Sequence, residues 1–240
     1  MEHGFNWLSL IPFMKEHDNI HHYGHVFMAV AVTILILITS LIARIQLAAA
    51  LKREDEGLVP DEKLTFRNFF EIVAEKLYGL AENVMGKDGA EKYFPIVGAL
   101  FLFIFVSNIV GLIPGLLPPT DNLNTTFALG AFVFLYYNYV GLRENGLSYL
   151  KHFAGPILWL APLMLIVEIA SHVFRPISLG LRLRGNIMGD HVVLGIFNDL
   201  IPPVLPAIFY GVGLFVALVQ AFVFCLMTMV YISLSASHDH

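Results

Sequence analysis

The chain has 240 residues, of which 57% are hydrophobic and 14% are charged. With a mean hydropathy of +0.72, this composition excludes an ordinary soluble domain and indicates a polytopic membrane protein. A net charge of −5 spread along the chain gives no basis for nucleic-acid binding. The single cysteine, Cys225, excludes an intrachain disulfide. The first residues lack a basic region followed by a small-residue cleavage site, so we expect no removable signal peptide.

The amino-terminal part combines an interfacial segment with the first expected span. Residues 1–23 mix aromatic side chains with histidines, which is typical of an external segment at the membrane surface. His21 and His25 are four residues apart and could share a helix face, but without a third ligand nearby the pattern does not favour a metal site. Residues 24–45 are apolar and long enough, at about 1.5 Å per residue, to form a first transmembrane helix.

The only long polar stretch covers residues 46–94. By the positive-inside rule its basic residues place it in the cytoplasm and the amino terminus outside; they are Lys52, Arg53, Lys63, Arg67, Lys76, Lys87 and Lys92. Residues 64–86 carry apolar side chains at helical spacing, which predicts an amphipathic helix on the membrane surface or against other helices. These side chains are Phe66, Phe69, Phe70, Val73, Leu77, Leu80 and Val84.

Four further spans are expected, at residues 95–117, 124–142, 156–198 and 203–235. The segment between the second and third has no basic residue and is expected to be external. The last two patterns far exceed the roughly 20 residues needed to cross perpendicularly, so they predict a long tilted hairpin. The sequence therefore predicts a single-domain, all-α integral membrane protein with five crossings, an amphipathic surface helix and a cytoplasmic carboxyl end.

A stripe of polar residues lies in the fourth expected span. Helical period places one set of side chains on one face: Glu168, His172, Arg175, Arg182, Asn186 and Asp190. Arg184 and His191 fall on the opposite side, although a kink at Pro176 could rotate the two halves. A charge at the centre of a membrane helix costs about 2.5–3.5 kcal/mol, so the stripe indicates function. The alternative is that these residues pair only to hold the helices together.

The final span supplies a polar counterpart. A hairpin centred near Ile201 would place Gln220 level with Arg182, since both lie the same number of residues from the turn. A membrane glutamine alone is often a helix-packing hydrogen bond. Level with an arginine, Gln220 is better interpreted as part of one site, where it could hydrogen-bond the guanidinium or hold water.

The run Ser178-Leu-Gly-Leu-Arg182-Leu-x-Gly-Asn186, preceded by Glu168 and followed by Leu218-Val-Gln220-Ala-Phe, resembles the a subunit of rotary F-type ATP synthases. The resemblance covers nearly the whole chain apart from its first 20 residues. It implies that Arg182 faces the ion-binding carboxylate of the rotating c-subunit ring, with Asn186 and Gln220 as polar neighbours. It also implies that Glu168 and His191 line aqueous half-channels.

The resemblance implies a non-catalytic subunit without a cofactor, which couples ion flow to ring rotation and ATP synthesis. Its expected partners are the c-subunit ring, the peripheral-stalk b subunits, the rest of the complex and the lipid of a bacterial inner membrane. The ring carries the binding carboxylate, so the sequence leaves open whether the ion is H⁺ or Na⁺. A stand-alone secondary transporter that binds an anion at Arg182 is the alternative, but such folds usually carry inverted repeats, which are not found here. A structural scaffold is less compatible with the polar stripe.

Four positions depart from the family pattern. Arg184 stands where an aromatic or apolar residue is usual, and Gly189-Asp190 replaces the more usual Ala-Gly before His191. Gly213 occupies a place on the last helix where relatives often carry His or Glu. We therefore expect the proton route near His191 to use Asp190 or water.

Overall fold

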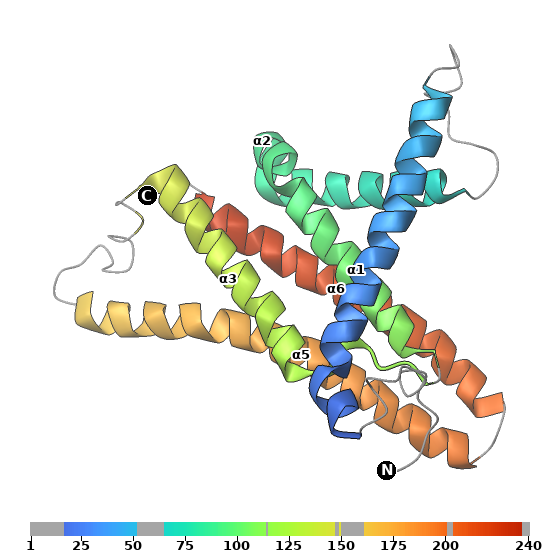
Figure 1. Cartoon of the computed structure of the whole chain (residues 1–240). Coiled ribbons are helices and arrows are strands. Elements are labelled where there is room, and N and C mark those ends of the chain that lie inside the picture. Colours follow the sequence, from blue (N-terminus) through green and yellow to red (C-terminus); the bar gives the residue numbers. More distant parts are fainter. Residues whose placement is uncertain are drawn as a thin grey trace.

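The computed structural model describes residues 17–51, 65–113, 115–146, 149, 161–200 and 204–236. They form the helices α1 (His17–Ala50), α2 (Phe66–Gly111), η3 (Pro119–Asp121), α3 (Leu123–Asn145), α5 (Ala161–Leu200) and α6 (Val204–Ala236) (Figure 1). Five of these helices are long and apolar enough to cross a membrane, which confirms the expected all-helical class. Most of the predicted external segment, up to residue 16, and the basic residues Lys52, Arg53 and Lys63 lie outside the described residues.

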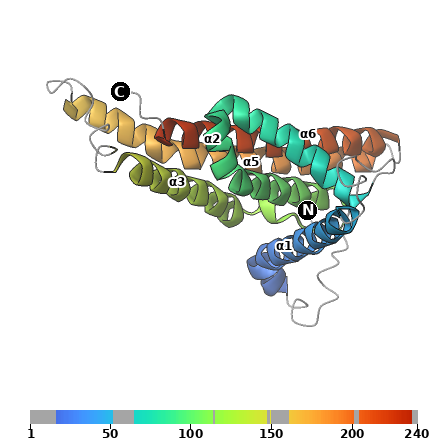
Figure 2. The ribbon, with the colours of Figure 1, turned by 90° about the horizontal axis from the view of Figure 1, so that it is seen from above.

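Helix α1 stands to one side of the layer formed by α2, α3, α5 and α6 (Figure 2). From residue 23 onward most of its apolar side chains are exposed, and only Met28, Val32 and Ala43 among them are buried. Its Thr33 and Thr39 hydroxyls donate to carbonyl oxygens one turn earlier, at 2.8 Å and 2.9 Å. Because hydrocarbon offers no hydrogen bonds, this local bonding suits a helix with a largely lipid-facing surface.

Helix α2 contains both the stretch expected to be amphipathic and the start of the second expected span. It begins after Thr65, whose side chain accepts a hydrogen bond from the backbone N–H of Asn68. Gly86 interrupts it with φ +73°, a conformation that only glycine adopts readily, and the two parts run in different directions (Figure 1). Leu77 in the first part is buried, whereas Phe66 is exposed. Arg67 and Asn68 at the start of α2 are buried as well, and the backbone N–H of Arg67 donates to Oε1 of Gln46 on α1, so the first part of α2 packs at both of its ends.

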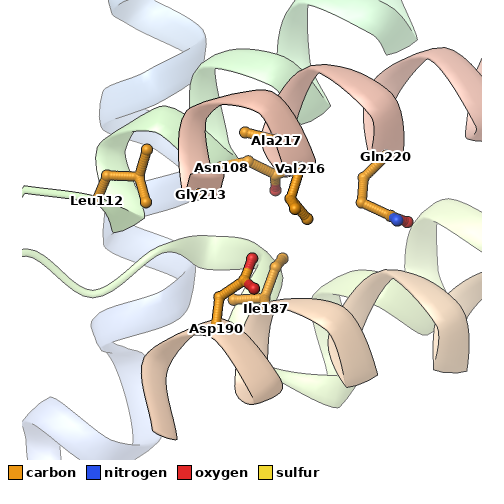
Figure 3. A pocket seen from close by; sticks show the side chains of 8 residues that line it. All are labelled: Asn108, Leu112, Ile187, Asp190, Gly213, Val216, Ala217 and Gln220. Carbon is orange, nitrogen blue, oxygen red and sulfur yellow. The ribbon is translucent and has the colours of Figure 1, made fainter. Parts of the chain in front are cut away.

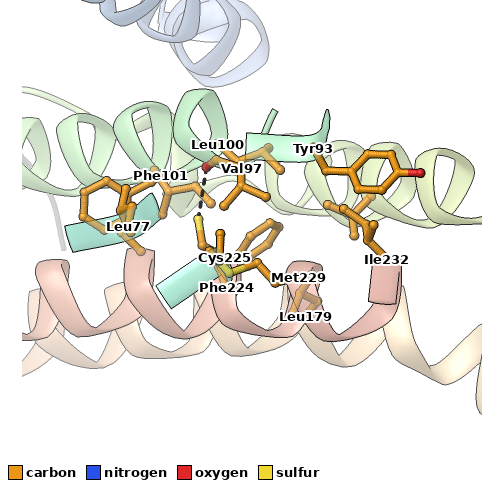
Figure 4. Packing of buried hydrophobic residues seen from close by; sticks show 14 of the residues in the cluster. Leu77, Tyr93, Val97, Leu100, Phe101, Leu179, Phe224, Cys225, Met229 and Ile232 are labelled. Carbon is orange, nitrogen blue, oxygen red and sulfur yellow. Dashed lines mark hydrogen bonds between the residues drawn. The ribbon is translucent and has the colours of Figure 1, made fainter. Parts of the chain in front are cut away.

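The main hydrophobic core lies chiefly between α2 and α6 (Figure 4). Val97 and Phe101 of α2 are buried against Phe224 and Met229 of α6. The thiol of Cys225 faces the carbonyl oxygen of Val97 at 3.5 Å, so it is a buried packing residue. This contact area fixes α6 relative to α2 and so positions the polar residues that α6 carries.

Helices α3 and α5 approach each other through glycines. A Cβ added at Gly130 would lie 2.6 Å from the carbonyl oxygen of Pro176, and one at Gly180 would lie 3.1 Å from the carbonyl oxygen of Thr126. Backbone contacts this close require the absence of a side chain. They fix α5 against α3 at Pro176 and one turn after it, and α6 packs antiparallel along the same helix (Figure 1).

Candidate functional site

Helix α5 presents two different faces around Arg182. Leu179, Leu183 and Ile187 recur every four residues and are buried in the core. Arg182 is exposed, and its exposed neighbours along the helix are apolar or small: Ser178, Leu181, Gly185, Met188 and Gly189. Within the described part of the chain, no carboxylate forms an ion pair with Arg182. A charge within a membrane span is costly, and such charges usually face a bundle interior, a water-filled cavity or a partner charge, so the exposed Arg182 is a candidate functional residue.

A small pocket with three polar residues in an otherwise apolar wall lies between α2, α5 and α6 (Figure 3). It is lined by Asn108, Leu112, Ile187, Asp190, Gly213, Val216, Ala217 and Gln220. The Asp190 carboxylate points from α5 into the gap below α6 (Figure 3). The pocket has a volume of about 20 Å³, and about 10–15 Å³ is enough for one water molecule. It brings Asp190 and Gln220 to one place, whereas neither Arg182 nor Asn186 lines it.

Asn108 is a polar residue in the wall of this pocket. Its Oδ1 accepts a hydrogen bond from the buried Thr120 hydroxyl at 2.9 Å. That bond fixes the amide orientation, and the buried Nδ2 group has no partner among the described residues. A buried amide without a hydrogen bond is unfavourable, so a water molecule in the pocket is its natural partner. From the sequence, Asn108 was expected only as one residue of the second span. The feature of the sequence that could have marked it is its position as a polar residue in an apolar stretch.

Gly213 is a buried wall of the same pocket. A Cβ at this position would lie 2.7 Å from Cδ2 of Leu112. A histidine or glutamate would therefore not fit here unless Leu112 moved. The carboxylate of Asp190, on the facing helix, lines the same pocket.

Glu168 lies about 21 Å from Arg182 along α5, at 14 residues of about 1.5 Å each. Its side chain is 40% exposed, and its Oε1 lies 3.6 Å from Nδ1 of the buried His172. The Arg175 guanidinium stacks over the Tyr231 ring of α6, 5.3 Å from the ring centre. Glu168, His172 and Arg175 therefore each have a neighbouring polar or aromatic side chain, and the Glu168 side chain is partly exposed whereas His172 is buried.

The remaining predicted residues have separate places. Asn186 is half-exposed on α5, and His191 lies in the same helix, but its side chain is outside the described residues. Arg184 donates from Nε to the carbonyl oxygen of Asp121 at 3.1 Å, which holds η3 against α5. Within the described ranges, no group of three metal-ligating side chains is found.

The fold and these sites define a class: an all-helical membrane protein that places charged and polar side chains within its spans for ion movement. Residues 25–233 match the family described as ATP synthase A chain. Subunit a from Bdellovibrio bacteriovorus is 45% identical over 98% of this chain and 99% of its own length. The Geobacter sulfurreducens subunit is 44% identical over 88% of this chain and 89% of its own, and the Sorangium cellulosum subunit is 41% identical over 97% and 95%.

The chain belongs to the family of ATP synthase subunit a, the non-catalytic, proton-translocating stator subunit of the complex. This confirms the resemblance drawn from the arginine motif. Membership also removes the stand-alone secondary transporter as an interpretation.

Proposed function

We propose that Arg182 discharges the carboxylate of a rotating c-subunit ring. The observation that supports this is its exposure on an apolar, small-residue face of α5. At about 4 Å and an effective dielectric of about 20, a guanidinium attracts a carboxylate by about 4 kcal/mol. It thereby favours the ionised form, and the ring carboxylate releases its proton. Small side chains beside the arginine allow a partner helix to approach closely.

The pocket around Asp190 is proposed as part of the external half-channel. Asp190 can hold and release a proton, while Asn108 and Gln220 can hold water beside it. His191, on the next residue of α5, is proposed to line the same route. Asn186 and Gln220 are proposed to help hold the guanidinium or the water near it.

Glu168 is proposed to line the mouth of the cytoplasmic half-channel, because its side chain is partly exposed and it lies far along α5 from Arg182. A proton that enters one half-channel must travel on the ring before it leaves by the other. Moving one charge down the membrane potential supplies about 2.3 kcal/mol per 100 mV, which drives the rotation.

The proposed partners follow from the same arrangement. The c-subunit ring packs on the Arg182 face, and the peripheral-stalk b subunits and the rest of the complex hold this chain as a stator. We propose a bacterial inner-membrane location with the amino terminus outside and the carboxyl terminus in the cytoplasm. The basic stretch between residues 46 and 94 supports this orientation.

Two substitutions at Arg182 test the central proposal. Arg182→Lys keeps a cation without the planar fork, so ATP synthesis should fall severely. Arg182→Ala should abolish synthesis and also allow a passive proton leak, because the positive barrier between the half-channels is lost. The measurement is proton uptake into vesicles stripped of the catalytic sector, with assembly checked by recovery of the ring. Normal synthesis by Arg182→Ala would defeat the proposal, whereas an assembled, inactive and proton-tight variant would refute only the barrier.

A further inference from the structure

A chain of polar contacts links Glu168 to the end of α3. Nδ1 of His172 lies 3.6 Å from Oε1 of Glu168, and Nε2 of the same ring lies 3.3 Å from the Tyr149 hydroxyl oxygen. The Tyr149 hydroxyl in turn lies 3.0 Å from Oδ1 of Asn138. His172 is 8% exposed and Tyr149 is also buried, so these contacts are shielded from solvent.

The hydrogen bonds of Asn138 determine where the protons lie. Its Nδ2 donates to the carbonyl oxygen of Phe134 at 2.7 Å, so its Oδ1 is the atom that faces Tyr149. A tyrosine hydroxyl has one proton, and Oδ1 can only accept. The hydroxyl therefore donates to Asn138 and presents a lone pair to His172. It follows that Nε2 of His172 carries a proton, and that Nδ1 is the nitrogen turned towards Glu168.

Packing holds both rings in these positions. A Cβ at Gly141 would lie 2.5 Å from Cε2 of Tyr149, so the tyrosine ring fits against α3 only because residue 141 is glycine. The His172 ring meets Tyr137 edge-on, with 5.7 Å between the ring centres. Burial raises the pKa of the Tyr149 phenol, which therefore keeps its proton at neutral pH.

We propose that Tyr149 and His172 are positioning residues for Glu168. Tyr149 accepts the Nε2 proton and fixes the imidazole, so that the lone pair of Nδ1 faces Glu168. Nδ1 then accepts from the carboxyl group of protonated Glu168 and holds that group at one orientation for proton exchange with water. The inference rests on the proposed role of Glu168 in the cytoplasmic half-channel. The other charged or titratable groups that face His172 are Arg175 on its own helix and Tyr137 on α3.

The test uses Tyr149→Phe, which keeps the ring against Gly141 and removes only the hydroxyl. The matched control is Tyr139→Phe, because Tyr139 is an exposed tyrosine on α3. ATP-driven proton pumping is measured in inverted vesicles that contain the whole synthase, with recovery of the ring as the assembly control. A hydrogen bond of about 0.5–1.5 kcal/mol corresponds to a loss of about 2- to 13-fold in rate. We expect such a loss for Tyr149→Phe and none for Tyr139→Phe.

A Glu168→Gln background separates positioning from general structural support. Glu168→Gln alone should slow pumping, and adding Tyr149→Phe should then cause no further loss. An equal loss in both backgrounds, or no loss in either, would overturn the inference and leave the role of Glu168 standing. Unchanged pumping by Glu168→Gln itself would instead remove Glu168 from the proton path, and the inference with it.

The pH profile gives a second readout that holds even if Glu168→Gln is inactive. Without the Tyr149 hydroxyl, the Nε2 proton is no longer held at that position and the Nδ1 lone pair is no longer fixed towards Glu168, so His172 stabilises the protonated Glu168 carboxyl less. Release of the Glu168 proton should then occur at a lower pH on the cytoplasmic side. We expect the pumping profile of Tyr149→Phe to move to lower pH relative to Tyr139→Phe. A uniform loss at every pH would indicate a structural role and overturn the inference.

Discussion

Adding one methyl group to the wall of the Asp190 pocket should impair proton conduction. In Gly213→Ala, the new Cβ would lie 2.7 Å from Cδ2 of Leu112. Carbon atoms in contact are normally about 3.5–4.0 Å apart, so the two groups must separate by about 1 Å. Both residues line a pocket of about 20 Å³, which has room for little more than one water molecule. The methyl group or the displaced leucine should therefore take the space of that water.

The Cδ2 atom is the end of a flexible side chain that can turn away, so the cost should lie near the lower end of the roughly 1–3 kcal/mol range of overpacking. A cost of about 1 kcal/mol that opposes the water-filled arrangement would lower the rate of proton transfer by about 5-fold. The assay is ATP synthesis in vesicles under an imposed proton gradient, with the amount of assembled complex measured in parallel. Adding Leu112→Ala should restore part of the rate, because it removes the side chain that the methyl group meets.

Gly211→Ala is the matched control for this experiment. Gly211 lies on the same helix two residues away, and a Cβ there has no atom within 4 Å. It should therefore synthesise ATP at the normal rate. If Gly213→Ala and Gly211→Ala were equally active with equal assembly, the pocket could not be part of the conducting path.

Two further predictions concern topology and packing. Single cysteines placed at Asp61 and Asp121 should be labelled from opposite sides of the membrane, because basic residues surround the first position and are absent around the second. Labelling of both from the same side would contradict the five-crossing topology. Gly130→Ala should destabilise the subunit by about 1–3 kcal/mol, because its Cβ would meet the rigid carbonyl oxygen of Pro176 at 2.6 Å. Thermal denaturation in detergent should show a lower denaturation temperature for Gly130→Ala. The control Gly79→Ala, whose added Cβ has no atom within 4 Å, should keep the normal temperature. Equal stability of the two variants would refute the close α3–α5 contact.

The sequence alone was sufficient for the five membrane-length helices. A bilayer offers no hydrogen bonds to the backbone, so a long apolar run must satisfy its own polar groups by forming a helix. Helical period was likewise sufficient to place Glu168 and His172 on one face, and the structure has them within 3.6 Å. Such relations are local, because they depend only on residues a turn or a few turns apart.

Helical period could not say which neighbour covers each part of α5. It grouped Arg182 with Asp190, yet Arg182 is exposed while Asp190 lines a pocket against α6. The stretch around residues 64–86 and the span after it were expected as separate elements, and Gly86, whose backbone angles are not helical, divides α2 into two helices at that point.

Only the tertiary structure decided the contacts between distant residues. Arg184 holds η3 against α5 through a hydrogen bond to the carbonyl oxygen of Asp121, 63 positions earlier in the chain. The lack of space for a side chain at Gly213 is caused by Leu112. The Tyr149 hydroxyl reaches His172 across 23 positions only because α3 carries a glycine where the ring lies. In each case a packed interface selects the partner. Composition and period determined which residues are helical and polar, and the packing of helices determined which of them meet.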